Sequence, residues 1–233
     1  MRVIFFFIIL YSTPLFASQN KIIRCVTTHY PPFTIYDTNT EKFTGLDIEY
    51  LRFIEHNLEL NIELVHLPWA RVQKEMKKDN FDCYFSLGNN PERAKYLDFT
   101  TVPLHITKFG LFTINDQNVI NNNLSQAAIS MLRGVDLPVE IAKKYAIDSN
   151  NIMRSLSSED TFKLLKKGRV QYAITNYQAG LWYTQPFKNI TSIELNEFQL
   201  PVYIAFKFGV IDTHKVDQQI KAFQAKRLNK NDD

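Results

Sequence analysis

Five short segments of the chain carry side chains suited to holding a small molecule. Each follows a predicted strand, and ligands of open α/β sheets bind at the carboxyl ends of the strands. The segments are 30–33 (YPPF), 68–69 (PW), 86–93 (SLGNNPER), 133–136 (RGVD) and 176–177 (NY). A guanidinium such as that of Arg93 can bind a carboxylate through two parallel hydrogen bonds, and aromatic rings offer flat apolar surface for stacking. The chemistry of these segments is therefore that of recognition.

Sequence patterns typical of catalysis or of metal and nucleotide binding are missing. The chain has no GxSxG, no GxGxxG and no GxxxxGK[ST], and its five histidines show neither HxxxH nor Cys/His spacing. Its 233 residues include 27 Lys and Arg against 24 Asp and Glu, a net charge of +3 without a dense basic stripe. This small net charge does not indicate the basic surface that binds nucleic-acid phosphates. We expect no catalytic residue, no metal, no cofactor and no nucleic-acid partner.

The hydrophobic pattern of the first half predicts alternating strands and helices. The expected order is a strand over 22–26, a helix after Gly45, a strand over 60–64, a helix from 68, a strand over 81–87 and a helix from 91. Asn90 is expected to cap the last of these helices, with Pro91 in its first position. Such alternation is typical of a parallel sheet with right-handed crossovers.

A second alternating set occupies the second half. Its expected elements are strands over 127–132, 152–156 and 170–175 and helices over 137–145, 158–167, 176–183 and 216–228. Asp136 is the expected cap of the helix over 137–145. Between the two sets lie extended apolar segments at 101–114 and 200–208.

This organisation predicts an α/β protein with two lobes. Each lobe is expected to be a mainly parallel sheet flanked by helices, and the two extended segments are expected to be the hinge crossings. Lobe one would comprise residues 20–105 and 205–233, and lobe two residues 106–204. The facing sheet edges would form a cleft between the lobes.

The first residues form a separate unit. A basic start at Arg2 precedes the apolar run 3–11 (VIFFFIILY), and the following segment reaches a small residue at Ala17. The run is far shorter than the roughly 20 residues that span a bilayer. We expect residues 1–17 to be a secretory signal peptide, cleaved after Ala17 or Ser18, and the mature protein to be soluble and periplasmic. The alternative is a buried N-terminal strand.

The chain has two cysteines, Cys25 and Cys83. An oxidising compartment allows them to pair. Both lie in apolar, strand-like segments, however, and neighbouring parallel strands often aim their side chains poorly for a disulfide. Two buried free thiols are therefore the favoured expectation, with a disulfide as the alternative.

Several stretches together resemble family 3 of the bacterial extracellular solute-binding proteins, the polar-amino-acid class of ABC importers. They are YPPFTIYD (30–37), FTGLDIEYLRFIEHNLEL (43–60), the segment 67–100 with its W, D and PER…LDFT, and the segment 157–183. The resemblance covers nearly all of the chain after the leader. It implies the two-lobed periplasmic-binding-protein fold of type II.

The resemblance also implies roles for residues of lobe one. Arg93, in the matching PER segment, would clamp a ligand carboxylate; its alternative is a surface arginine paired with an acid. Tyr30 and Trp69 match aromatic positions that flank the ligand, and core packing is their alternative role. Ser86 and Gly88 match a strand end whose backbone and hydroxyls reach the ligand, although Gly88 stands where many members carry Ser.

Lobe two departs further from the family pattern. The turn at Gly134 lacks the usual threonine, because Val135 follows it, and Arg133 beside it could supply a second positive contact. Asn176 stands where amino-acid binders usually place an Asp for the ligand ammonium, and an amide cannot pair with that cation as a carboxylate does. These departures favour an organic acid over an α-amino acid.

The function expected from these features is binding rather than catalysis. A monomeric periplasmic protein would capture a small carboxylate-bearing solute, an amino acid or related organic acid, and present it to an inner-membrane ABC permease. One alternative is an enzyme on the same scaffold, similar to the cyclohexadienyl dehydratases, with His29 as its candidate acid or base. Another is a sensory partner that docks on a receptor.

Overall fold

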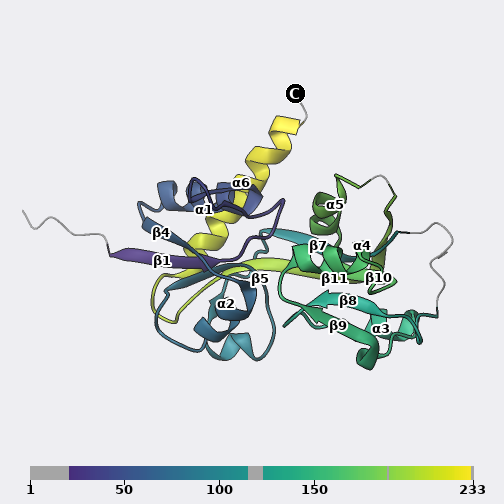
Figure 1. Ribbon diagram of the computed structural model, residues 1–233. Coiled ribbons are helices and arrows are strands. Elements are labelled where there is room, and N and C mark those ends of the chain that lie inside the picture. The colour runs from purple at the N-terminus through teal and green to yellow at the C-terminus, as the bar shows by residue number, and fades with distance from the viewer. Residues whose placement is uncertain (1–20, 115–122, 188, 232–233) are drawn as a thin grey trace, which may run out of the picture.

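The computed structural model describes residues 21–114, 123–187 and 189–231. The predicted signal peptide at 1–17 lies outside these residues. Two groups of helices and strands are joined by the long strands β7 (His105–Thr113) and β11 (Thr191–Phe206), which run from one group to the other (Figure 1). The two-lobed α/β fold is therefore confirmed. None of the helices within the described ranges is long and apolar enough to cross a membrane.

Lobe one is built on three parallel strands. β1 (Ile22–Thr27) lies between β4 (Asn61–His66) and β5 (Cys83–Gly88) and pairs in parallel with both. The helices of this lobe are α1 (Leu46–Asn57), α2 (Trp69–Glu75) and α6 (Thr213–Asn231). Its short elements are the hairpin β2 (Ile35–Asp37) and β3 (Lys42–Thr44), the 3-10 helix η1 (Arg93–Lys95), and β6 (Asp98–Phe99).

Lobe two repeats the plan. β8 (Ile129–Leu132) pairs in parallel with β9 (Ile152–Ser155) and β10 (Tyr172–Asn176). Its helices are α3 (Val139–Lys144), α4 (Ser158–Lys166) and α5 (Tyr177–Thr184), with the 3-10 helix η2 (Ser149–Asn151) before β9. The Ser157 side chain caps α4 by accepting a hydrogen bond from the backbone N–H of Asp160, at 3.0 Å.

The two crossing strands join both lobes into one sheet. β11 pairs antiparallel with β5 of lobe one and with β7, and β7 pairs antiparallel with β10 of lobe two. The strand order is β4-β1-β5-β11-β7-β10-β8-β9, with β6 attached to β11. The register of the β7–β11 pair shifts between Leu195 and Gln199.

The buried apolar side chains form separate clusters in the two lobes. The larger cluster of lobe one centres on Leu51 and Phe206, and that of lobe two on Leu111 and Ile174, all at most 1% exposed. We retain the division into 20–105 with 205–233 and 106–204 as a proposal, which this separation of the cores supports.

Two local predictions need correction. The expected helix after Pro91 is only the three-residue η1, whose N-cap is Glu92 rather than Asn90, although Asn90 Oδ1 accepts the Arg93 N–H at 2.8 Å. The helix over 137–145 is shortened to α3, whose N-cap is Pro138, so Asp136 is not its cap. Pro138 fixes an extended backbone directly before the helix and so displaces its start.

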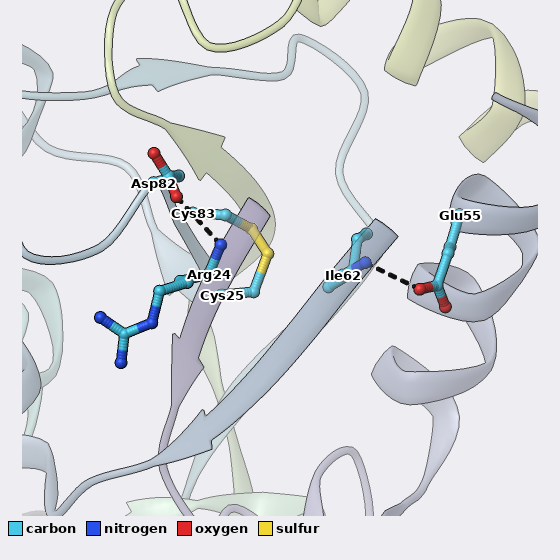
Figure 2. Close-up of a disulfide and its surroundings, with 6 residues drawn as sticks. All are labelled: Arg24, Cys25, Glu55, Ile62, Asp82 and Cys83. Carbon is cyan, nitrogen blue, oxygen red and sulfur yellow. Dashed lines mark hydrogen bonds between the residues drawn. A yellow bond between two sulfur atoms is a disulfide. The ribbon is translucent and has the colours of Figure 1, made fainter. Parts of the chain in front are cut away.

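The expectation of free thiols is wrong, because Cys25 and Cys83 form a disulfide (Figure 2). The two residues are direct partners in the parallel β1–β5 register, with Cα atoms 4.2 Å apart. Residues opposed in this way point to the same face of a sheet, so their sulfur atoms meet. The Arg24 N–H beside Cys25 also donates to the Asp82 carboxylate beside Cys83, at 3.0 Å.

Candidate functional site

A cavity of about 670 Å³ lies between the lobes. Of the eight predicted site residues, seven line it: Tyr30, Trp69, Ser86, Gly88, Arg93, Gly134 and Asn176. Five of these come from lobe one and two from lobe two. The volume is in the range of small-molecule sites, which suits a ligand enclosed from both sides.

Arg93 reaches the cavity from η1. Its Nη1 donates to the Gly88 carbonyl at 2.6 Å, and its guanidinium lies 5.2 Å from the centre of the Trp69 ring. Among the described residues it has no carboxylate within ion-pair distance. Burial lowers the pKa of Arg93, yet a guanidinium stays charged at neutral pH. Arg93 thus presents a fixed cation with unused donors to the cavity.

Trp69 lies at the start of α2 and touches lobe two. Its Nε1 donates to the Gly134 carbonyl at 3.3 Å, and Gln73, one turn later on α2, donates to the same oxygen at 3.0 Å. Gly134 has a φ of +77° and stands so close that a Cβ there would collide with the Gln73 side chain. The positive φ favours glycine at this turn, whereas the colliding atoms are the movable end of the Gln73 side chain.

Asn176 and Tyr30 lie together on the lining. Asn176 caps α5, because its Oδ1 accepts the Ala179 N–H at 2.9 Å. Burial, and then the Asp47 carboxylate, raise the pKa of Tyr30 far above its usual range, while the side chains of Thr107 and Asn176 oppose that rise. Tyr30 is therefore a neutral hydroxyl at any physiological pH.

Ser86 is held by a buried polar group beneath the cavity. Its Oγ donates to Asp47 Oδ2 and lies 2.9 Å from the Thr34 hydroxyl, while His105 Nε2 is 2.9 Å from Asp47 Oδ1. Ser86 has a φ of +58°, an unfavourable backbone for a non-glycine residue. The Ser86 hydroxyl is therefore hydrogen-bonded to Asp47 and Thr34, and the unusual backbone conformation sets the direction of this side chain.

Arg133 is the predicted residue that the cavity does not include. Its side chain is exposed, and its backbone N–H donates to the Ser155 carbonyl at 3.0 Å beside the β8–β9 pair. Alternation along the strand end turns this side chain away from the cleft. The second positive contact expected from Arg133 is therefore absent from the lining described here.

Two lining histidines were missed as binding candidates. His29 Nδ1 accepts the Tyr36 N–H at 3.1 Å, and the ring of Tyr36 stacks on His66 with centroids 4.3 Å apart. Burial lowers the pKa of both histidines, and for His66 the neighbouring His29 adds to this effect. Their places at the ends of β1 and β4 were readable from the sequence, but no spacing marked them.

The arrangement can hold an anion. Its fixed cation, aromatic face and neutral polar groups surround one enclosed volume. None of the described residues forms a cluster of His, Cys, Asp and Glu able to hold a metal ion.

The model of the bacterial extracellular solute-binding proteins, family 3, matches residues 22–230. The chain belongs to this family. Family 3 membership accounts for the two crossing strands and for a cavity lined by both lobes. It also confirms the resemblance noted in the sequence.

Two curated proteins similar to this chain are binding proteins by name. The chain is 28% identical over 168 residues to a probable amino-acid ABC transporter-binding protein of Haemophilus influenzae, covering 69% of this chain and 61% of that protein. It is 24% identical over 199 residues to the L-cystine-binding protein TcyA of Bacillus subtilis, covering 84% and 72%. The match thus spans less than two thirds of the Haemophilus protein.

A solved structure shares the fold. The arginine-bound form of truncated ArgBP from T. maritima superposes with a TM-score of 0.73 at 15% identity, covering 88% of this chain and 97% of that one. At this identity the likeness supports the fold and not the ligand.

Proposed function

We propose that the protein is a periplasmic receptor that captures a small carboxylate-bearing solute between its lobes and delivers it to an ABC importer in the inner membrane. The observation that carries the proposal is Arg93, an unpaired guanidinium on the lining of the cavity between the lobes. A guanidinium binds a carboxylate in bidentate fashion, and such a charged pair contributes about 1.5–3 kcal/mol net. Since micromolar affinity needs about 8 kcal/mol, Arg93 orients the ligand and the rest of the lining supplies most of the binding energy.

The proposed ligand site consists of Tyr30, Trp69, Ser86, Gly88, Arg93, Gly134 and Asn176. Trp69 gives a flat face beside the cation, and Gly134 brings lobe two against it. Family membership and the names of the two curated relatives support transport as the role. We propose that the protein acts as a monomer, since the cavity needs no second copy to be enclosed on both sides.

An extracytoplasmic location is supported by two features. Disulfides such as Cys25–Cys83 persist in oxidising compartments. The sequence also carries a basic residue, Arg2, followed by an apolar run of signal-peptide length. We therefore propose export to the periplasm with cleavage near Ala17.

Isothermal titration tests the proposed ligand contact. A thermal-shift screen of L-amino acids, dicarboxylates and aromatic acids first selects the tightest binder. Arg93→Ala should then weaken its binding at least tenfold, and Arg93→Lys should recover only part, because lysine lacks the paired donors. Arg52→Ala, an exposed arginine on α1, is the matched control and should leave binding unchanged. A loss below threefold for Arg93→Ala would remove it from the site.

X-ray scattering tests the proposed closure of the lobes. With the selected solute at saturating concentration, the radius of gyration should fall, as expected for hinge motion. Identical curves with and without a solute of proven affinity would contradict the closure.

Binding rather than catalysis is proposed for this cavity. His29 has one ring nitrogen engaged by the Tyr36 backbone, which leaves a single nitrogen for any proton transfer. Family membership supports binding, so purified protein should not turn over prephenate or arogenate. Turnover that disappears in His29→Ala would favour the enzyme instead.

A further inference from the structure

Asn176 uses only one end of its side chain within the protein. Oδ1 accepts the Ala179 N–H, and this cap fixes which end of the amide faces inward. The residue is 8% exposed and lines the cavity, and its Nδ2 faces the Tyr30 hydroxyl, whose pKa it lowers, without a well-formed hydrogen bond to any described residue. Even with one N–H turned to Tyr30, the second N–H of this group stays unused. Buried donors are rarely left unpaired in folded proteins, so this NH₂ group is available to a ligand.

Two other groups on the lining also present donors. His29 Nδ1 accepts the Tyr36 N–H, so in the neutral ring the proton is on Nε2. Arg93 spends one contact on the Gly88 carbonyl and keeps its remaining N–H groups. Unused donors thus come from both lobes.

The lining has no buried carboxylate, among the described residues, that could pair with a ligand ammonium group. The acids on the lining, Asp136, Glu140 and Glu159, are all exposed, and Glu159 lies 3.0 Å from Lys163. The buried Asp47 is outside the lining and is engaged by Ser86 and His105.

The carbonyls at two of the lining turns are already engaged within the protein. The Gly88 carbonyl already accepts from Arg93, and the Gly134 carbonyl accepts from both Trp69 and Gln73. An ammonium enclosed beside the Asn176 amide would lose its water and meet another donor, which is strongly unfavourable.

We infer that Asn176 is a specificity-determining residue that selects an oxygen acceptor, so the solute is an organic acid without an α-ammonium group. One carboxylate binds Arg93, and a second oxygen, from a keto, hydroxyl or carboxylate group, accepts from Asn176 Nδ2. This inference rests on the proposed function and narrows its solute class.

Matched acid pairs test the inference on the wild-type protein. Titration compares 2-oxoglutarate with L-glutamate, L-malate with L-aspartate, and phenylpyruvate with L-phenylalanine. In at least one pair the oxygen acid should bind at least tenfold more tightly than its amino counterpart. Equal or tighter binding of the amino acid in every pair, or failure of all three oxygen acids to bind, would overturn the inference.

Asn176→Asp isolates the donor, because aspartate keeps a capping oxygen for Ala179 and replaces only the NH₂ end. The preference for the oxygen acid should fall at least tenfold in this variant. Asn90→Asp is the matched control, since Asn90 also lines the cavity and caps a backbone N–H through Oδ1. It adds the same charge, so it should weaken both members of a pair alike and preserve their ratio. An unchanged ratio in Asn176→Asp would contradict the assignment.

The two proposals fail in different ways. If an amino acid wins every pair and its binding depends on Arg93, the selectivity assigned to Asn176 is wrong and the receptor function stands. If the tightest solute binds equally well to Arg93→Ala, the proposed carboxylate site is wrong.

Discussion

The side-chain amide of Gln73 in lobe one donates a hydrogen bond to the carbonyl of Gly134 in lobe two, at 3.0 Å. Trp69 Nε1 reaches the same oxygen. One carbonyl therefore receives two donors from α2, and the contact joins the lobes at the lining of the cavity. Nothing in the local sequence around Gln73 indicated this contact, because it joins residues 61 positions apart.

Gly134→Ala should weaken solute binding at least tenfold. Alanine is strained at a φ of +77°, and its Cβ would displace the end of the Gln73 side chain, which donates to the Gly134 carbonyl across the lobes. Titration with the tightest solute of the screen measures the loss. Combining Gly134→Ala with Gln73→Ala should restore part of the affinity, because the colliding side chain is removed. No recovery in the double variant would assign the loss to backbone strain alone.

Removing the disulfide should lower the free energy of unfolding. The bond joins residues 58 positions apart, and closing a loop of this size restricts the unfolded chain by roughly 4 kcal/mol. The double variant Cys25→Ala with Cys83→Ala should therefore unfold at a lower urea concentration than the oxidised wild type. Reduced wild type should approach the variant, and the variant itself should not respond to reductant. Equal midpoints for the oxidised wild type and variant would contradict the expectation.

Asp217 should be important for stability where α6 meets the start of the first crossing. Its buried carboxylate accepts the backbone N–H groups of Thr101 and Val102, both at 2.9 Å, and the Thr101 hydroxyl at 2.6 Å. Asp217→Ala should cost about 2–4 kcal/mol in urea unfolding, because several buried donors lose their charged partner. Lys221→Ala, at an exposed position of the same helix, should change stability by less than about 0.5 kcal/mol. Similar losses for the two variants would refute a special role of the carboxylate.

Glu75 should make stability depend on acid pH. The Asn80 amide, then Lys78 and Arg71, lower the pKa of Glu75 from its ordinary 4.5 to about 2. Because the folded-state pKa is depressed, this stabilisation is present above about pH 4.5 and is lost as the pH falls towards 2. Urea unfolding of wild type and Glu75→Gln at pH 7, 4 and 2.5 should show a difference that shrinks with acidity. A difference independent of pH would contradict it.

The sequence predicted what depends on local pattern. Apolar alternation located the strands around Ile23 and Ile62, and a Ser at position 157 marked the start of α4. Loops at strand ends then brought Tyr30, Arg93 and their partners to one cavity, since the fold places those ends together.

The predictions that were wrong depended on side-chain direction and on the register between strands. The disulfide required knowing that Cys25 and Cys83 are direct partners across two strands, and strand order alone does not say this. Arg133 follows a strand end but points outward, because one residue reverses the face. The direction of the Asn176 NH₂ group could be seen only once its capping bond had fixed the other end of the amide.

The crossing strands β7 and β11 are hydrogen-bonded neighbours along most of their length. Twisting one lobe against the other would shear this ladder, whereas bending across the ladder preserves its pairs. We therefore expect the proposed cleft to open by a single bending motion, which one angle between the lobes describes. A single pair of spin labels, one on α1 and one on α4, should suffice to follow the whole motion.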